Sequence, residues 1–289
     1  MTPLPAHDHS NKSKPFHVHI TGFGPFGEHT INPSWQAVKQ LHQTTLDSRP
    51  APLAASSSRS KSSITATSPP SSNGSSSTRP IHFTSTLIPV TYASSLSIVP
   101  QLHTTSTGPK PDLIIHVGVG APYSLTLEAL ARKFSYDKPD VDQTYAPLDH
   151  ETGYRGFTGL GEVFDRSDEV LHSSIDVDKV LRASRGEGGG IEFLRISKDA
   201  GLFLCEFTFC ASLAWAKFLA TTHSNDVGTA RRDVDRDIPN EKRQETPVQF
   251  IHVPPVGLPY SLPELTQALR IIIWAIVNEG GLSFYSAVD

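Results

Sequence analysis

The sequence is short of cysteine, of net charge and of long apolar runs, and each shortage excludes a class of protein. Its two cysteines, Cys205 and Cys210, are too few for the disulfide framework of a small secreted domain. A formal net charge of -4 and a pI of about 6.3 provide no basic surface for nucleic acid. The longest apolar run, residues 271–277, is too short to cross a bilayer, and residues 1–15 lack the apolar segment of a secretory signal. We therefore expect a cytoplasmic globular protein that binds neither nucleic acid nor membranes; its oligomeric state stays open.

Apolar segments of strand length and of helix length alternate along the chain. Strands are predicted at residues 17–21, 81–90, 113–118, 191–196 and 248–253. Helices are predicted to begin after Asn32, near Ser94, Val177 and Leu202, and after Ser261. The strand at 113–118 is apolar on both faces, which is typical of the middle of a sheet that is covered on both sides. The alternation predicts an α/β fold, a three-layer α/β/α sandwich with a mainly parallel mixed central sheet.

Polar tracts interrupt these segments. Residues 1–15 are predicted to form a disordered tail, and residues 16–289 a single α/β domain. Within it, residues 44–79 are rich in Ser, Thr and Pro and are predicted to be a low-complexity insert in a surface loop, because they contain few large apolar side chains. Two further polar inserts are expected at about residues 137–190 and 222–247.

A glycine-rich loop follows the first predicted strand. Residues 22–27 match the spacing of a dinucleotide-binding fingerprint, but the context argues against that function. Pro25 removes a backbone N–H where a pyrophosphate needs donors, and the helix begins only at Pro33. The loop also carries two phenyl rings, Phe23 and Phe26, which suit either a binding surface or the core beneath a loop.

The candidate reactive groups are a cysteine, a histidine and a glutamate. Cys205 lies at the start of an apolar helix, where the helix dipole and the unpaired N–H groups favour a thiolate. His252, in a short apolar strand, has the side chain that usually serves a thiol as base. Taken singly, each is more often a core residue than a catalytic one. Glu128 follows the central strand, where α/β proteins place their sites. The thirteen histidines lack metal-binding spacing, so we expect no metal.

Taken together, these motifs resemble the pyroglutamyl peptidase I (pyrrolidone-carboxylate peptidase) family, in the order that the family has them. The polar tracts resemble those of eukaryotic-style members, since typical relatives are shorter. The resemblance covers nearly all the structured blocks, and its most specific parts are the glycine-rich opening and the segments around Cys205 and His252. The matching segments are residues 21–27, 32–35, 88–90 with Tyr92, 115–118, 126–128, 200–205 and 250–254.

The resemblance implies a cysteine peptidase that removes N-terminal pyroglutamyl residues from peptides without metal or organic cofactor. Its catalytic triad would be Glu128, Cys205 and His252, with the thiol as nucleophile, the imidazole as base and the carboxylate orienting the imidazole. The flat, neutral lactam would lie in an apolar slot, with an amide bonding its polar edge. The residues implied for substrate binding are Phe23, Phe26, Asn32, Phe203 and Leu204.

Several neighbouring positions depart from the family pattern. Val119 stands where many relatives have glutamine, and Lys138 replaces an arginine that relatives place near the reacting carbonyl. Lys138 is therefore a possible contact for that carbonyl or its oxyanion, with the charge of arginine but not its planar fork. Lys198 and Glu206 replace asparagines, and Glu206 would oppose a thiolate at Cys205. These departures keep open an alternative, a catalytically degenerate member that binds pyroglutamyl or related peptides without cleaving them.

Overall fold

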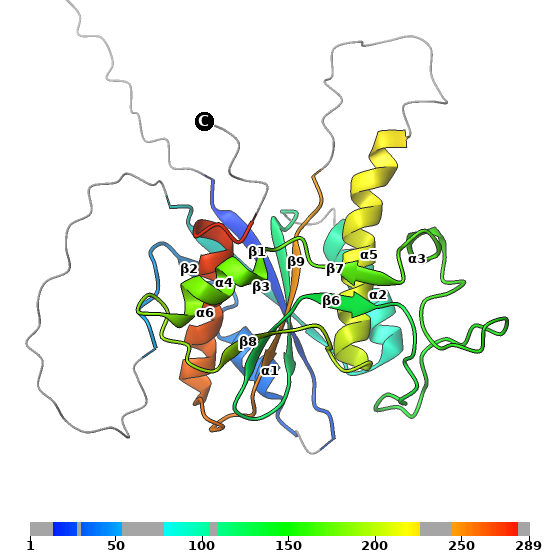
Figure 1. The fold of residues 1–289 in the computed structure, drawn as a ribbon, viewed down its shortest axis with the longest axis horizontal. Coiled ribbons are helices and arrows are strands. Elements are labelled where there is room, and N and C mark those ends of the chain that lie inside the picture. The colour runs from blue at the N-terminus through cyan, green and yellow to red at the C-terminus, as the bar shows by residue number, and fades with distance from the viewer. Residues whose placement is uncertain (1–13, 28–29, 54–77, 105–108, 226–243, 283–289) are drawn as a thin grey trace, which may run out of the picture.

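A seven-stranded sheet lies between two layers of helices (Figure 1). The computed structural model describes residues 14–27, 30–53, 78–104, 109–225 and 244–282. In order across the sheet, the strands are β2 (Thr45–Leu46), β3 (Ile81–Ile88), β1 (Phe16–Phe23), β4 (Leu113–Val119), β9 (Val248–Val253), β5 (Leu125–Glu128) and β8 (Leu194–Ser197).

Helices cover both faces of this sheet. One face carries α1 (Pro33–Lys39), α4 (Val177–Arg185) and α6 (Leu262–Asn278), and the other carries α2 (Tyr92–Thr104) and α5 (Leu204–Asn225). The short helix α3 (Glu162–Asp165) packs against α5. A separate two-stranded sheet of β6 (Leu130–Arg132) and β7 (Val170–His172) also lies against α5.

The strand directions make the sheet mixed but mainly parallel. Strands β3, β1, β4 and β9 run parallel to one another. Strand β5 is antiparallel to β9 and parallel to β8, and the two-residue strand β2 is antiparallel to β3 at the edge. The three-layer α/β/α architecture predicted from the sequence is confirmed.

Local sequence signals explain where several helices begin. The side chain of Asn32 accepts a hydrogen bond from the backbone N–H of Ser34, and Pro33 occupies the first turn of α1. At α6, Glu264 accepts from the N–H of Ser261 at 2.7 Å, which satisfies an N–H group at the helix start. Helix α5 begins at Leu204, two residues later than predicted.

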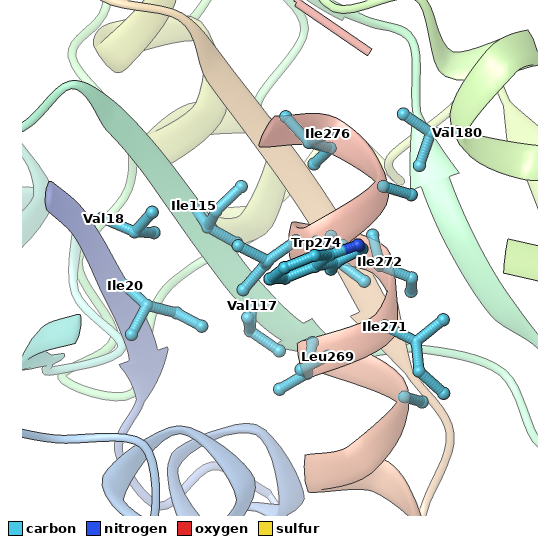
Figure 2. Close-up of a cluster of buried hydrophobic side chains, with 14 of the residues drawn as sticks. Val18, Ile20, Ile115, Val117, Val180, Leu269, Ile271, Ile272, Trp274 and Ile276 are labelled. Carbon is cyan, nitrogen blue, oxygen red and sulfur yellow. The ribbon is translucent and has the colours of Figure 1, made fainter. Parts of the chain in front are cut away.

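The core on the α6 face joins that helix to the central strands. Figure 2 shows Leu269, Ile272 and Ile276 of α6 beside Val18 and Ile20 of β1 and Ile115 and Val117 of β4. These side chains are fully buried. Burying an aliphatic side chain of this size stabilises the fold by roughly 1.5–3 kcal/mol. The central strands are thereby fixed at one face, while α2 and α5 cover the other.

The predicted insert at 44–79 is corrected at its start. Thr45 and Leu46 form strand β2 against β3, Arg49 makes an ion pair with Glu279 at 2.5 Å, and Leu53 lies in the core at 9 % exposure. These residues are ordered by partners distant in sequence, which composition does not show. Residues 1–13 of the predicted tail at 1–15, and residues 54–77 of this insert, lie outside the described residues.

The other two predicted inserts differ in how much of them the structure describes. Residues 137–190 are described in full and contain α3, β7 and α4, together with a turn-rich hairpin in which Leu148 bridges to Arg155. Of the expected insert at 222–247, residues 226–243 lie outside the described part of the chain. The fold therefore places more of the polar sequence against the domain than composition alone indicates.

Replacing Leu53 should test whether residues 44–53 belong to the core. Leu53→Ala is expected to lower the free energy of unfolding by about 2–3 kcal/mol, because it leaves a cavity among packed side chains. Urea denaturation followed by circular dichroism measures this change. Leu148→Ala, at a side chain that is 39 % exposed, is the matched control and should change it by less than about 0.5 kcal/mol. Equal effects at the two positions would contradict the placement of Leu53 in the core.

Candidate active site

Cys205 is the second residue of α5, at the end of a tightly turned loop. The N–H of Phe207 bonds to the carbonyl of Phe203 at 2.9 Å, which makes Phe203 the residue that opens the helix. Before it, Gly201 and Leu202 both adopt positive φ, at 101° and 47°. A positive φ is unfavourable for a leucine, and helix α5 begins only after this turn, two residues later than the sequence predicts. The turn leaves Cys205 in the first turn of α5, where the helix dipole favours negative charge.

Two glycines, one in β4 and one directly after it, make room for the reactive groups. A Cβ added at Gly118 would lie 2.9 Å from Sγ of Cys205, and one added at Gly120 would lie 2.8 Å from Cβ of His252. Any larger side chain at either position would displace the thiol or the imidazole. The carboxyl end of β4 is therefore the surface on which both groups rest.

Glu128 and His252 meet across the antiparallel pair β5 and β9. Glu128 lies opposite Phe250, so His252 is its diagonal neighbour on the same face of the sheet. Nδ1 of His252 lies 2.8 Å from Oε1 of Glu128, whose side chain is 2 % exposed. His252 is also hydrogen-bonded to Cys205. The three residues thus form a line from a buried carboxylate, through the imidazole, to the half-buried thiol.

The charge state of His252 follows from its two partners. Burial by itself lowers the pKa of His252, but the charge and hydrogen bond of Cys205, followed by those of Glu128, outweigh burial and raise it to about 10. At neutral pH the ring is then an imidazolium. An imidazolium beside a thiol at a helix N-terminus is the arrangement that supports a thiolate.

The second cysteine has a different environment. Cys210 lies in α5, on the side that is fully buried in the core. Burial, and then the nearby charge of Glu206, raises the pKa of the Cys210 thiol well above its usual range. A protonated, enclosed thiol is unreactive. The structure thus separates one candidate nucleophile from one structural cysteine.

The aromatic residues implied for substrate binding divide into two groups. The half-buried rings of Phe26 and Phe203 lie 5.7 Å apart, and Tyr92 meets Phe203 edge-on at 6.3 Å. Phe23 and Leu204 are buried in the core cluster behind them. The structure therefore brings all four predicted apolar residues together, with two at the surface and two supporting them. Tyr92 is an addition that the site argument from sequence did not include.

Asn32 is occupied within the protein. Its Oδ1 accepts from both the N–H and the hydroxyl of Ser34, and its Nδ2 donates to the carbonyl of Gly24 at 2.9 Å. Asn32 therefore fixes the glycine-rich loop to the start of α1. An amide nitrogen has two hydrogens, so one N–H remains for a ligand.

The four departures from the family pattern lie in different environments. Val119 pairs with Val253 at the end of the sheet, Lys198 is exposed, and Lys138 is exposed with its charge acting on Asp199. Glu206, by contrast, is completely buried.

Glu206 does not stand uncompensated beside the thiol of Cys205. It makes an ion pair with Arg132, with 2.7 Å between Nε and Oε1. Sequence reasoning missed Arg132. The only signal was a cation directly after the apolar segment that contains Glu128, and nothing local indicates its partner.

The described residues contain neither a metal-binding cluster nor a membrane-spanning helix. Within the ranges given above, no cluster of three or more His, Cys, Asp or Glu side chains is arranged to hold a metal ion. Among the described helices, none combines the length and the apolar character needed to cross a bilayer.

Comparison with known proteins gives consistent matches. A family model described as pyroglutamyl peptidase matches residues 16–58. The human protein named pyroglutamyl-peptidase 1 is 28 % identical over 263 residues, which cover 89 % of this chain and 87 % of the human one. The crystal structure of pyroglutamyl peptidase I from Bacillus amyloliquefaciens superposes with a TM-score of 0.58 at 21 % identity, over 92 % of this chain and 97 % of the other.

A second solved structure has the same fold. A mutant pyrrolidone carboxyl peptidase from Pyrococcus furiosus has a TM-score of 0.58 at 17 % identity, over 93 % of this chain and all of the other. At such identities the structures establish the fold alone. The chain is similar in sequence to pyroglutamyl peptidases along most of its length, and it has their fold.

Proposed function

We propose that this protein is a cysteine peptidase that removes N-terminal pyroglutamyl residues from peptides. The observation that carries the proposal is the hydrogen-bonded line Glu128–His252–Cys205, with the cysteine in the first turn of α5. Nucleophile, base and an orienting carboxylate in hydrogen-bond reach of one another are the signature of acyl transfer through a covalent intermediate. The names of the relatives supply the substrate class.

In the first half of the reaction, Cys205 acts as nucleophile. Its thiolate attacks the carbonyl carbon that joins the pyroglutamyl residue to the next amino acid, and a C–S bond forms as the carbonyl oxygen becomes an oxyanion. We assign the stabilisation of that oxyanion to the backbone N–H groups at the start of α5, which have no acceptor within the helix. The His252 imidazolium then donates its proton to the leaving nitrogen. The C–N bond breaks, and a thioester with Cys205 remains.

In the second half, water replaces the departed peptide. His252, now neutral, takes a proton from the water as its oxygen attacks the thioester carbonyl. The C–S bond breaks, free pyroglutamate leaves, and the thiolate–imidazolium pair is restored. Throughout, Oε1 of Glu128 keeps its hydrogen bond with Nδ1 and so orients and stabilises the imidazolium.

The proposed specificity comes from the aromatic slot. A pyroglutamyl lactam is flat and uncharged, and Phe26 and Phe203 offer faces of matching size, supported by the buried Phe23 and Leu204. Burying the lactam's polar groups without partners would cost about 1–3 kcal/mol each. We assign the remaining N–H of Asn32 to one of them.

Lys138 and the cellular location complete the proposal. Lys138 is near Asp199, in the loop that leads to the nucleophile, so we propose that its ammonium group contacts the reacting carbonyl. A cytoplasmic location suits the two free cysteines, because thiols persist in a reducing compartment.

Release of a fluorophore from a pyroglutamyl amide tests this function, with the corresponding prolyl amide as control. Cys205→Ala and His252→Ala should each lower kcat by at least about 1,000-fold, because nucleophile and base act as a unit. Glu128→Gln should cost less, by roughly one to two orders of magnitude, since the amide still bonds the ring. If the wild-type protein binds a pyroglutamyl peptide without cleaving it, and Cys205→Ala binds equally, the protein is a degenerate binder instead.

Alkylation should distinguish the two cysteines. Iodoacetamide is expected to modify Cys205 at least about 100-fold faster than Cys210, because Cys205 lies beside an imidazolium whereas Cys210 is enclosed. Peptide mass spectrometry after timed quenching measures both rates. Activity should disappear in step with modification of Cys205. Activity that survives complete modification of Cys205 would exclude it as the nucleophile.

The pH dependence should report the partners of His252. Because the pKa of His252 is raised to about 10, kcat/KM should persist through neutral pH and fall as the pH rises through about 10, where the proton donor is lost. In Glu128→Gln, the loss of the carboxylate charge lowers that pKa, so the alkaline limb should move to lower pH by about one unit or more. An unchanged alkaline limb in Glu128→Gln would show that Glu128 does not act on the imidazole.

A further inference from the structure

The carboxylate of Glu206 is completely buried and uses all its acceptor positions. Oε1 accepts from the backbone N–H of Arg132 at 3.0 Å and from its Nε at 2.7 Å. Oε2 accepts from Nη2 of Arg132 at 2.9 Å and from the backbone N–H of Leu202 at 2.9 Å. A carboxylate has about four acceptor sites, so this one is saturated by donors from two separate segments.

Arg132 extends the same network into the loop before the nucleophile. Its Nη2 also donates to Oδ1 of Asp199, and that oxygen accepts from the N–H of Gly201 at 3.2 Å. Asp199 is tied in turn to Ser197 at the end of β8, whose hydroxyl accepts from the Asp199 N–H at 3.0 Å. Residues 199–202 are therefore held at both ends by one guanidinium group and its two carboxylate partners.

This hydrogen-bond network holds the turn that leads directly to Cys205. Gly201 and Leu202, which it holds, have the positive φ angles that turn the chain into α5. Glu206 is the residue after Cys205 in the first turn. Arg132 lies four residues after Glu128, so one short stretch of chain carries both the triad carboxylate and the partner of the nucleophile's loop.

We propose that Arg132 is a positioning residue. Together with Glu206 and Asp199 it holds the backbone of residues 199–205 in place. Sγ of Cys205 and the first N–H groups of α5 are thereby directed at the carbonyl of the bond to be cleaved. This inference rests on the proposed function. The guanidinium fork is required, because it bonds both oxygens of Glu206 through two nitrogens while reaching a second carboxylate. A lysine ammonium in its place keeps the charge and loses that geometry.

Arg132→Lys tests the proposal, and the chain provides a matched control. Arg49 also makes a bidentate pair, with Glu279 at 2.5 and 3.1 Å, but it joins the segment after β2 to the end of α6 on the opposite face of the sheet. Arg132→Lys should lower kcat by about 10- to 100-fold with KM within about twofold, because a displacement of about 1 Å at a reacting group costs a factor of that size. Arg49→Lys should leave both constants unchanged.

Melting temperatures and alkylation rates complete the test. Arg132→Lys should lose more thermal stability than Arg49→Lys, because Glu206 is completely buried and Glu279 is not. Kinetics are therefore measured well below both melting temperatures, where each variant is folded, and a kcat loss confined to Arg132→Lys then reports positioning. Iodoacetamide should modify Cys205 at a rate that differs at least about threefold between Arg132→Lys and wild type, and not between Arg49→Lys and wild type. Should Arg132→Lys fail to fold, Glu206→Gln, which keeps the side-chain shape, is measured in the same way. A kcat and an alkylation rate both within twofold of wild type would overturn the proposal.

The two proposals fail separately. If the wild-type protein hydrolyses no pyroglutamyl amide, the proposed function fails, and the alkylation rate of Cys205 alone decides on Arg132. A changed rate then still supports a positioning role, and an unchanged rate rejects it. If the wild-type protein is active and Arg132→Lys is equally active, only the inference about Arg132 falls.

Discussion

Strand β9 lies between a parallel neighbour, β4, and an antiparallel one, β5, and the site depends on this change of direction. Because β5 runs against β9, Glu128 at its end lies opposite Phe250, deeper in the sheet than His252. The carboxylate is therefore buried under the imidazole and bonds its inner nitrogen at 2.8 Å. The outer nitrogen is left to face Cys205.

The same arrangement explains the electrostatics of the site. Burial alone would keep the pKa of His252 low, as it does for His116, a fully buried histidine of β4 whose pKa burial lowers to about 3. His252 differs because two acidic partners face it, and together they raise its pKa to about 10. For Cys210, five residues beyond Cys205, burial and the charge of Glu206 act in the same direction and raise the pKa of its thiol well above the usual range. Environment, rather than residue type, separates the reactive groups from their structural counterparts.

At the carboxyl ends of the strands, two glycines and one buried ion pair hold the reactive groups in place. Gly118 and Gly120 permit the thiol and the ring to lie directly on β4. On the far side of Cys205, the buried pair of Arg132 and Glu206 holds the turn that begins α5. Glu206 departs from the family pattern in residue type, and its charge is compensated here by Arg132.

The sequence by itself determined the alternation of strands and helices, the caps of α1 and α6, and the helix-start position of Cys205. These features depend on near neighbours along the chain, such as Asn32 with Pro33 and Ser261 with Glu264. The family resemblance supplied the three candidate triad residues, but not their geometry. Only the tertiary structure decided that Glu128 lies within 2.8 Å of a histidine 124 positions away, that Leu53 joins the core, and that Arg132 neutralises Glu206. Strand order, register and burial arise from contacts between distant segments, and the composition of a short stretch such as residues 125–128 or 45–53 carries no record of them.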